Sequence, residues 1–469
     1  MAVLLTFVVL AVVLWRFNRG FWPGLSCCVA FLVSLPKAIQ IHLPGSLPAL
    51  TVHRLIVVLI LFFWLREGYG RFIASEIPFR KLLLWIFMTQ AVSVIFAADV
   101  IASIKELLYY SLENLLYFVL LVTVVREPQD GVRLVRSVYL GLLWVAVIAF
   151  VEKYKGYSPM QYFPDYYEGT VMSTFSHRIL LGTAMAMGWS LCMLSAAAAT
   201  TFKQRTMAWM TSLLCIAACY FAQSRGPWMG MLLAGVTFVI LGSKEMRKWL
   251  LFVAVLAAIV WISNSGVRNT IRGRAGSTFV EESDAQVSYE WRWELWRKAW
   301  SEITKSPIRL ALGYGPGASE ALNWEGDVSF LDNYTDSFSS WDNNWAAYLL
   351  ECGLLGFGVL LCFYAVLMCR MLKIWQLAQG KEKEFCTYII GALVVFIFMQ
   401  TNVKIFAPQV YFIFWTTAAA GIALGRRQPS DDMTNDSAEQ EELTVEAESL
   451  GEEPDCESIC QLLAGRIGA

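Results

Sequence analysis

The chain of 469 residues is too apolar for a soluble globular protein. Hydrophobic residues make up 57% of it and charged residues 16%, with a mean hydropathy of +0.52. Because the apolar residues are gathered in blocks, the composition excludes a soluble enzyme and predicts a polytopic membrane protein. The net charge of −1 gives no indication of a nucleic-acid partner.

Windows of roughly 20 apolar residues, the length that crosses a hydrocarbon core of about 30 Å, predict an all-α fold with about twelve or thirteen transmembrane helices. In chain order they lie near residues 2–15, 21–36, 51–65, 82–98, 107–125, 137–152, 179–199, 207–223, 228–242, 249–263, 345–369, 386–403 and 409–425. The first window lacks a basic stretch before it and the second follows at once, which argues against a cleaved signal peptide.

Lys and Arg are concentrated in alternate loops, which are therefore expected on the cytoplasmic side. This places the long loop outside the cytoplasm and the C-terminus inside. None of the 11 Cys residues lies in an outer loop, so no disulfide framework is expected there. The expected segments are residues 1–263 with ten transmembrane helices, 264–344 as the large extracytoplasmic loop, 345–425 with the last three helices, and 426–469 as an acidic, disordered cytoplasmic tail.

Arg225 lies in FAQSRGPWMG, residues 221–230, at the outer end of a predicted span. Gly226 and Pro227 form the turn into the next span, since Pro suits the first turn of a helix. An Arg at membrane depth is costly and usually faces a cavity or an anion. The alternative is that Arg225 extends to the lipid headgroups.

Arg292 lies in YEWRWELWRKAW, residues 289–300, within the long loop. Trp293, Trp296 and Trp300 recur at helical spacing, which predicts an amphipathic helix at residues 288–302 on the membrane surface. Such a helix explains the aromatic residues. It does not explain Arg292.

Two further stretches bring polar groups to the predicted outer face. In GYGPG, residues 313–317, the backbone at Gly315 and Gly317 can approach an anionic group, although such a sequence more often forms a plain tight turn. Asp342 and Asn343 directly precede an apolar window, where a helix N-cap is a sufficient explanation.

The order and spacing of these stretches resemble the O-antigen ligase and polymerase superfamily of bacterial envelope enzymes. The resemblance covers residues 170–360 in SRGPW, RWELWRKAW, PIRLALGYGPG and DNNWAAYLLECGLLG, and residues 101–120 look like an earlier helix of the family. It implies a GT-C-like fold in the bacterial inner membrane, with an active site facing the periplasm. It also implies transfer of a glycan from undecaprenyl pyrophosphate to an acceptor hydroxyl.

In this family two outer-face arginines hold the pyrophosphate, and the ligases place His before Asn at the head of a late span. The resemblance carries the arginines onto Arg225 and Arg292, and the His–Asn pair onto Asp342 and Asn343. Two guanidinium forks would balance the departing diphosphate without a metal or another cofactor. Asp342 would act as general base, while Asn343 orients it or binds sugar hydroxyls.

Aspartate in place of histidine favours a polymerase of surface polysaccharide over a ligase that acts on lipid A core or another acceptor. Asp332, Asp336 and Glu351 are alternative bases. His177 and Arg178, which follow a Tyr-rich stretch, are candidates for sugar or pyrophosphate contact, but an interfacial aromatic belt accounts equally well for the tyrosines. The expected partners are a lipid-linked glycan donor, a sugar acceptor, membrane lipid and a chain-length regulator.

A transporter such as a lipid-linked oligosaccharide flippase is the competing class, because about twelve to fourteen spans with intramembrane charge also fit it. A transporter should show internal repeats and several charges near span midpoints. Here Glu113 is the acid expected to be buried within a span, no convincing repeat is present, and the other polar candidates gather at one face. A peptidoglycan polymerase of the cell-shape family is a second enzymatic alternative.

Overall fold

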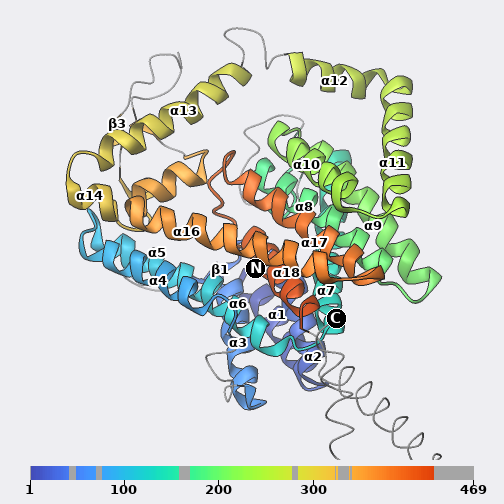
Figure 1. Cartoon of the computed structure of the whole chain (residues 1–469), viewed down its shortest axis with the longest axis horizontal. Helices are drawn as coiled ribbons and strands as arrows, with labels where there is room; N and C mark the ends of the chain where they lie inside the picture. Colours follow the sequence, from blue (N-terminus) through green and yellow to red (C-terminus); the bar gives the residue numbers. More distant parts are fainter. Residues whose placement is uncertain are drawn as a thin grey trace, which may run out of the picture. The chain divides into compact units, whose positions relative to one another are not determined.

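A computed structural model describes most of the chain (Figure 1): residues 2–41, 49–69, 77–157, 170–276, 284–322, 324–325, 337–338 and 341–426. The chain divides into two compact units, Met1–Gly425 and Arg426–Ala469. Beyond Arg426, the second unit and its predicted acidic tail lie outside the described residues. The first unit is almost entirely helical, which confirms the predicted all-α class.

The helices of the N-terminal half overlap the predicted apolar windows, but two begin well before them: Pro128–Lys155 begins nine residues before the window of 137–152, and the helical stretch Val100–Val124 begins seven residues before the window of 107–125. The helices of this half are α1 (Ala2–Phe17), α2 (Phe21–Ser34), α3 (Val52–Arg66), α4 (Arg80–Ile95), α5 (Val100–Tyr110), the π-helix η3 (Ser111–Leu116), α6 (Tyr117–Val124), α7 (Pro128–Lys155) and α8 (Arg178–Ala197). Two short strands, β1 (Gln40–Ile41) and β2 (Leu50–Thr51), pair antiparallel before α3.

The C-terminal half begins with three helices in apolar windows and continues into the long polar loop. Its helices are α9 (Phe202–Phe221), α10 (Arg225–Leu241), α11 (Lys244–Ser263), α12 (Ser265–Gly276), α13 (Asp284–Ile303), α14 (Pro307–Leu312), α15 (Ala318–Ala321), α16 (Asn344–Leu377), α17 (Gly380–Met399) and α18 (Pro408–Leu424). Strands β3 (Trp324–Glu325) and β4 (Ser337–Phe338) form a second antiparallel pair. The amphipathic stretch predicted at residues 288–302 lies in α13.

Several helices have the length and apolarity of membrane spans, so the chain is a multi-pass membrane protein. Within the described ranges five are long enough: Val100–Val124, Pro128–Lys155, Arg178–Ala197, Met246–Ser263 and Asn344–Leu377. Shorter apolar helices are Val3–Phe17, Phe21–Ser34, Arg225–Leu241 and Pro408–Leu424. The total of about twelve or thirteen spans stays a prediction.

Helix α8 is buried along its whole length and packs against α7, α9, α10 and α17. Glycines allow this close approach: a Cβ added to Gly182 would lie 2.6 Å from Pro227, and one added to Gly188 would lie 2.5 Å from Leu142. Since Gly182 and Pro227 are both near helix starts, the N-terminal ends of α8 and α10 lie together.

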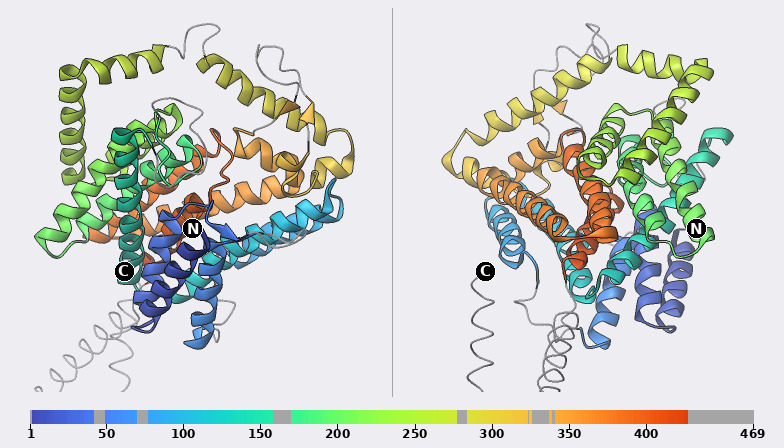
Figure 2. Two further views of the ribbon diagram at one scale, coloured as in Figure 1. Left: turned by 180° about the vertical axis from the view of Figure 1, so that it is seen from behind. Right: turned by 45° about the vertical axis from the view of Figure 1, so that its right-hand side comes forward.

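Helices α13, α14 and α15 pack against α16, while α14 and α15 also contact α4 and α5 (Figures 1 and 2). Two glycines with positive φ let the backbones meet. A Cβ on Gly313 (φ +70°) would lie 2.5 Å from the main chain of Glu351, and one on Gly353 (φ +62°) would lie 2.5 Å from the main chain of Ala311. Gly353 also interrupts the regular backbone of α16.

Candidate functional site

Three helices begin at residues that the sequence analysis singled out. His177 caps α8, and its Nδ1 accepts a hydrogen bond from the main-chain N–H two residues later over 3.3 Å. Helix α10 begins at Arg225. Asn343 caps α16, and its Oδ1 accepts from the N–H three residues later over 3.1 Å. Capping therefore accounts for Asn343 and not for Asp342, which precedes the cap.

The loop of residues 400–407 between α17 and α18, here the α17–α18 loop, holds the start of α16. The main-chain N–H of Asn344 donates to the carbonyl of Gln400 over 2.9 Å, and their side chains are also hydrogen bonded. The N–H of Lys404 donates to the carbonyl of Trp341 over 3.1 Å. These bonds fix the backbone on both sides of Asp342.

The α17–α18 loop also contacts α10, α13 and α8. A Cβ on Gly226 would lie 3.2 Å from Oδ1 of Asn402, so the first turn of α10 lies against the loop. Arg292 of α13 donates from Nη2 to the carbonyl of Asn402 over 3.1 Å. The rings of His177 and Phe406 have centroids 6.2 Å apart. Residues from four distant parts of the chain thus meet at one loop.

The residues near the α17–α18 loop, here the cluster, are His177, Arg178, Arg225, Arg292 and Asp342, with more basic than acidic side chains. Burial lowers the pKa of Arg292, and the negative charge of Asp342 partly offsets that effect. Burial also lowers the pKa of His177; Asp342 opposes the change and Arg178 adds to it. Arg178 and Arg225 are the first residues of α8 and α10, whose starts approach the α17–α18 loop, and Arg292 bonds to the same loop. Positive helix ends there also favour an anion.

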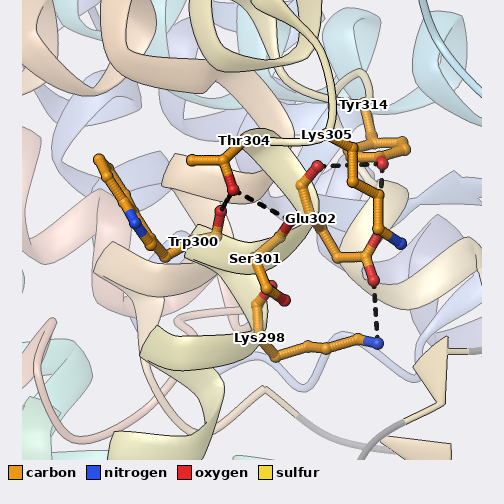
Figure 3. Close-up of polar contacts among 7 residues, drawn as sticks. All are labelled: Lys298, Trp300, Ser301, Glu302, Thr304, Lys305 and Tyr314. Carbon is orange, nitrogen blue, oxygen red and sulfur yellow. Dashed lines mark hydrogen bonds and ion pairs between the residues drawn. The ribbon is translucent and has the colours of Figure 1, made fainter.

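The C-terminal end of α13, the helix that carries Arg292, is held by Glu302 (Figure 3). The carboxylate of Glu302 lies 2.6 Å from Nζ of Lys305 and 2.9 Å from Nζ of Lys298. The hydroxyl of Tyr314 donates to it over 3.2 Å. Burial acts to raise the pKa of Glu302, but the two lysines more than offset this and the pKa is lowered.

Gly315 and Gly317, predicted to approach an anion, lie against α5 and the turn before it. A Cβ on Gly315 would lie 2.5 Å from both Cβ of Ala97 and Oγ of Ser103, and one on Gly317 would lie 3.2 Å from Cβ of Glu106. Both glycines have positive φ, +95° and +78°. The structure shows a packing reason for glycine at both positions, and contact with an anion stays a prediction.

Residues 210–361 match the family model described as O-antigen ligase. This match supports the predicted resemblance to the O-antigen ligase and polymerase superfamily. The match includes Arg225, Arg292 and Asp342, the three predicted catalytic residues. It supports an enzyme that performs glycosyl transfer of the ligase or polymerase type. No match was found among curated proteins.

A second polar group, partly within the O-antigen ligase domain, lines a cavity of about 110 Å³. Nζ of Lys404 lies 2.9 Å from Oε1 of Glu351 and 3.2 Å from Oε1 of Glu320. The ion pair of Arg54 and Glu113, 2.7 Å between Nε and Oε1, lines the same cavity. The sequence alone marks Glu113 and Glu351 as unusual, because carboxylates are rare inside apolar windows. It does not indicate which basic residues pair with them.

Proposed function

We propose that this protein is a glycosyltransferase that moves a glycan from undecaprenyl pyrophosphate to a sugar hydroxyl on the periplasmic side of the bacterial inner membrane, with its C-terminus in the cytoplasm. One observation carries the proposal: the α17–α18 loop bonds both to Arg292 and to Trp341, the residue before Asp342, and Arg292 and Asp342 both lie within the stretch that matches the O-antigen ligase model. The donor would reach the cluster from the bilayer, and the acceptor from outside.

The guanidiniums supply what a departing diphosphate needs. Arg225 and Arg292, with Arg178 as a further contact, would donate charge-assisted hydrogen bonds to phosphate oxygens, which Arg can bind in bidentate fashion. As the bond from the sugar C1 to the phosphate oxygen breaks, its electron pair stays on that oxygen and undecaprenyl pyrophosphate leaves. Positive groups already in place stabilise the developing charge, and the proposal uses no metal.

Asp342 would accept the proton of the acceptor hydroxyl while the acceptor oxygen forms its bond to C1. Asn343, as the cap of α16, holds the helix start beside it. Because no residue of the chain is proposed to bond to the sugar, the transfer is a direct displacement and inverts the configuration at C1.

Within this reaction type we propose a polymerase of surface-polysaccharide repeat units, working with a chain-length regulator. Asp342 supports this choice, because the ligases that this chain resembles carry histidine at the corresponding position. Transfer to lipid A core or another acceptor is the second candidate, and the ligase description of the matched family model favours it.

The test uses the purified full chain in lipid nanodiscs, with an undecaprenyl-pyrophosphate-linked repeat unit and a chelator of divalent ions. A ladder of products supports the polymerase. A single transfer to an added lipid A core acceptor supports the ligase. A parallel assay uses the same protein reconstituted into sealed vesicles: movement of the lipid-linked sugar across their membrane, without any transfer, would overturn glycosyl transfer and favour a flippase.

A further inference from the structure

The cavity around Lys404, here the Lys404 cavity, shares a wall with the cluster that contains Arg292 and Asp342. Lys404 and Phe406 of the α17–α18 loop line the cavity, while Phe406 also contacts the ring of His177. Asn344, two residues after Asp342, lines the cavity as well. A ligand in the cavity would therefore be separated from the cluster by little more than the start of α16 and this loop.

The centre of the Lys404 cavity is a satisfied ionic network. Nζ of Lys404 donates to Oγ of Ser319 over 2.6 Å and to Glu351 over 2.9 Å, and Ser319 is itself hydrogen bonded to Glu351. Burial acts to lower the pKa of Lys404, but Glu351, Glu320 and Glu106 together raise it. Lys404 is thus a fixed cation whose charge is already balanced by protein carboxylates.

Other polar groups of the lining form no hydrogen bond or ion pair within the part of the chain that the structure describes. Glu106 lines the cavity and acts on Lys404 through its charge alone. The ring of Tyr109 lies over the guanidinium of Arg54, 3.4 Å from Cζ to the ring centroid. Among the described contacts, the hydroxyl of Tyr109 takes part in none. These groups are available to a ligand.

The composition of the lining selects the class of ligand. Four carboxylates, those of Glu106, Glu113, Glu320 and Glu351, face three cations, so an additional anion such as a diphosphate is disfavoured. Carboxylates, amides and tyrosine hydroxyls suit sugar hydroxyls, and aromatic rings suit the apolar face of a pyranose. The volume of about 110 Å³ corresponds to roughly four water molecules at their liquid share of about 30 Å³ each, so the cavity has room for part of one sugar ring.

We propose that the Lys404 cavity binds one neutral or amino sugar of the glycan acceptor, through Glu106, Glu320 and Tyr109, and so presents a neighbouring hydroxyl to Asp342. This inference rests on the proposed glycosyl transfer. The two regions then divide the substrates by charge: the cationic cluster holds the donor diphosphate, and the carboxylate-lined cavity holds the acceptor sugar. A uronic acid is excluded from the cavity because its carboxylate would meet those of Glu106 and Glu320.

The test measures binding separately from turnover. The probes are the free repeat-unit oligosaccharide, released from the lipid donor by mild acid, and inorganic pyrophosphate, each titrated into the full chain in nanodiscs. Glu106→Gln should raise the Kd for the oligosaccharide about tenfold, because a hydrogen bond to a charged acceptor is lost. Tyr109→Phe keeps the ring over Arg54 but removes the hydroxyl, and should also weaken binding of the oligosaccharide. Glu382→Gln, at an exposed carboxylate in the first turn of α17, is the matched control.

Arg292→Ala should show the opposite pattern, with weaker pyrophosphate binding and an unchanged Kd for the oligosaccharide. If Glu106→Gln and Tyr109→Phe both bind the oligosaccharide with the same Kd as the control variant, the proposed sugar site is wrong. This holds even if glycosyl transfer is observed. If transfer is absent and binding still depends on Glu106, the sugar site stands and the catalytic proposal fails.

Discussion

Arg292 donates a hydrogen bond from Nη2 to the main-chain carbonyl of Asn402 over 3.1 Å, although 110 residues separate the two. The bond attaches α13 to the α17–α18 loop, and the same loop bonds to the start of α16 beside Asp342. A guanidinium carries five N–H donors, so its position can be set by the protein while other donors face a ligand. This linkage is why a helix from the long loop can serve a site at the ends of apolar helices.

Replacement of Arg292 should remove transfer without unfolding the protein. Arg292→Ala is expected to lower kcat about 10²- to 10³-fold, the usual effect of deleting one group that stabilises transition-state charge. Arg292→Lys should recover little, because a single ammonium does not reproduce the guanidinium fork. The control is Arg297→Ala on the same helix, whose exposed side chain pairs with Glu294 at 3.3 Å. Equal rates for Arg292→Ala and Arg297→Ala would rule out the phosphate-binding role.

Asn343→Ala should reduce stability, because it removes the side-chain cap of α16. The expected cost is about 1 kcal/mol, with a lower unfolding temperature and faster hydrogen exchange in the first turn of that helix. Asn343→Asp should retain the cap. If Asn343→Ala leaves hydrogen exchange in the first turn of α16 unchanged, the assignment of the cap is wrong.

Gly315→Ala should destabilise the protein more than an alanine at another positive-φ glycine. Gly68 has φ +78° and no atom within 4 Å of an added Cβ, so Gly68→Ala carries only the backbone strain of about 1–2 kcal/mol. Gly315→Ala adds a clash with Ala97 and Ser103, and overpacking typically costs about 1–3 kcal/mol more. Thermal unfolding of both variants measures the difference. Equal stabilities, with weaker pyrophosphate binding in Gly315→Ala, would instead favour the anion role of this turn.

The end of α13 should loosen in acid. The pKa of Glu302 is lowered in the folded chain. Its contribution to stability is therefore fully present above the usual glutamate pKa of about 4.3, and is lost as the pH falls through the pKa of the folded chain. Protection against hydrogen exchange across residues 298–305, taken relative to the intrinsic rate at each pH, should therefore fall below that pH in the native chain. Glu302→Gln should be less protected at neutral pH and show less change in acid. Native protection that stays constant in this segment as the pH falls would contradict the account.

The sequence was sufficient for the helices and for local capping. Windows of apolar residues predicted α1–α4, α6–α11 and α16–α18, because length and apolarity are properties of a continuous stretch, whereas most of α5 lies outside them. Asn343 as a cap follows from its place before an apolar run. The family resemblance rested on motifs of the same local kind, and the matched O-antigen ligase model confirms it.

The Lys404 cavity could not be predicted in the same way, because its pairs join distant parts of the chain. Arg54 and Glu113 are 59 residues apart, and Glu351 and Lys404 are 53 apart. A charged residue in an apolar window signals a partner without naming it. The π-helical turn that carries Glu113 also has no signature in the periodicity of a single sequence.

The rate of glycan transfer by Asp342→Asn tests the central claim most directly. The substitution keeps the shape of the side chain and leaves the cap on Asn343, so stability should not change, while the loss of a general base should lower kcat about 10²- to 10⁴-fold. Purified wild-type and variant proteins would be compared with the lipid-pyrophosphate-linked repeat unit at saturating donor and acceptor. The account predicts a rate at least about 100-fold below wild type, with Asp342→Glu partly active. A variant that transfers glycan at the wild-type rate would show that the carboxylate of Asp342 takes no part in the reaction.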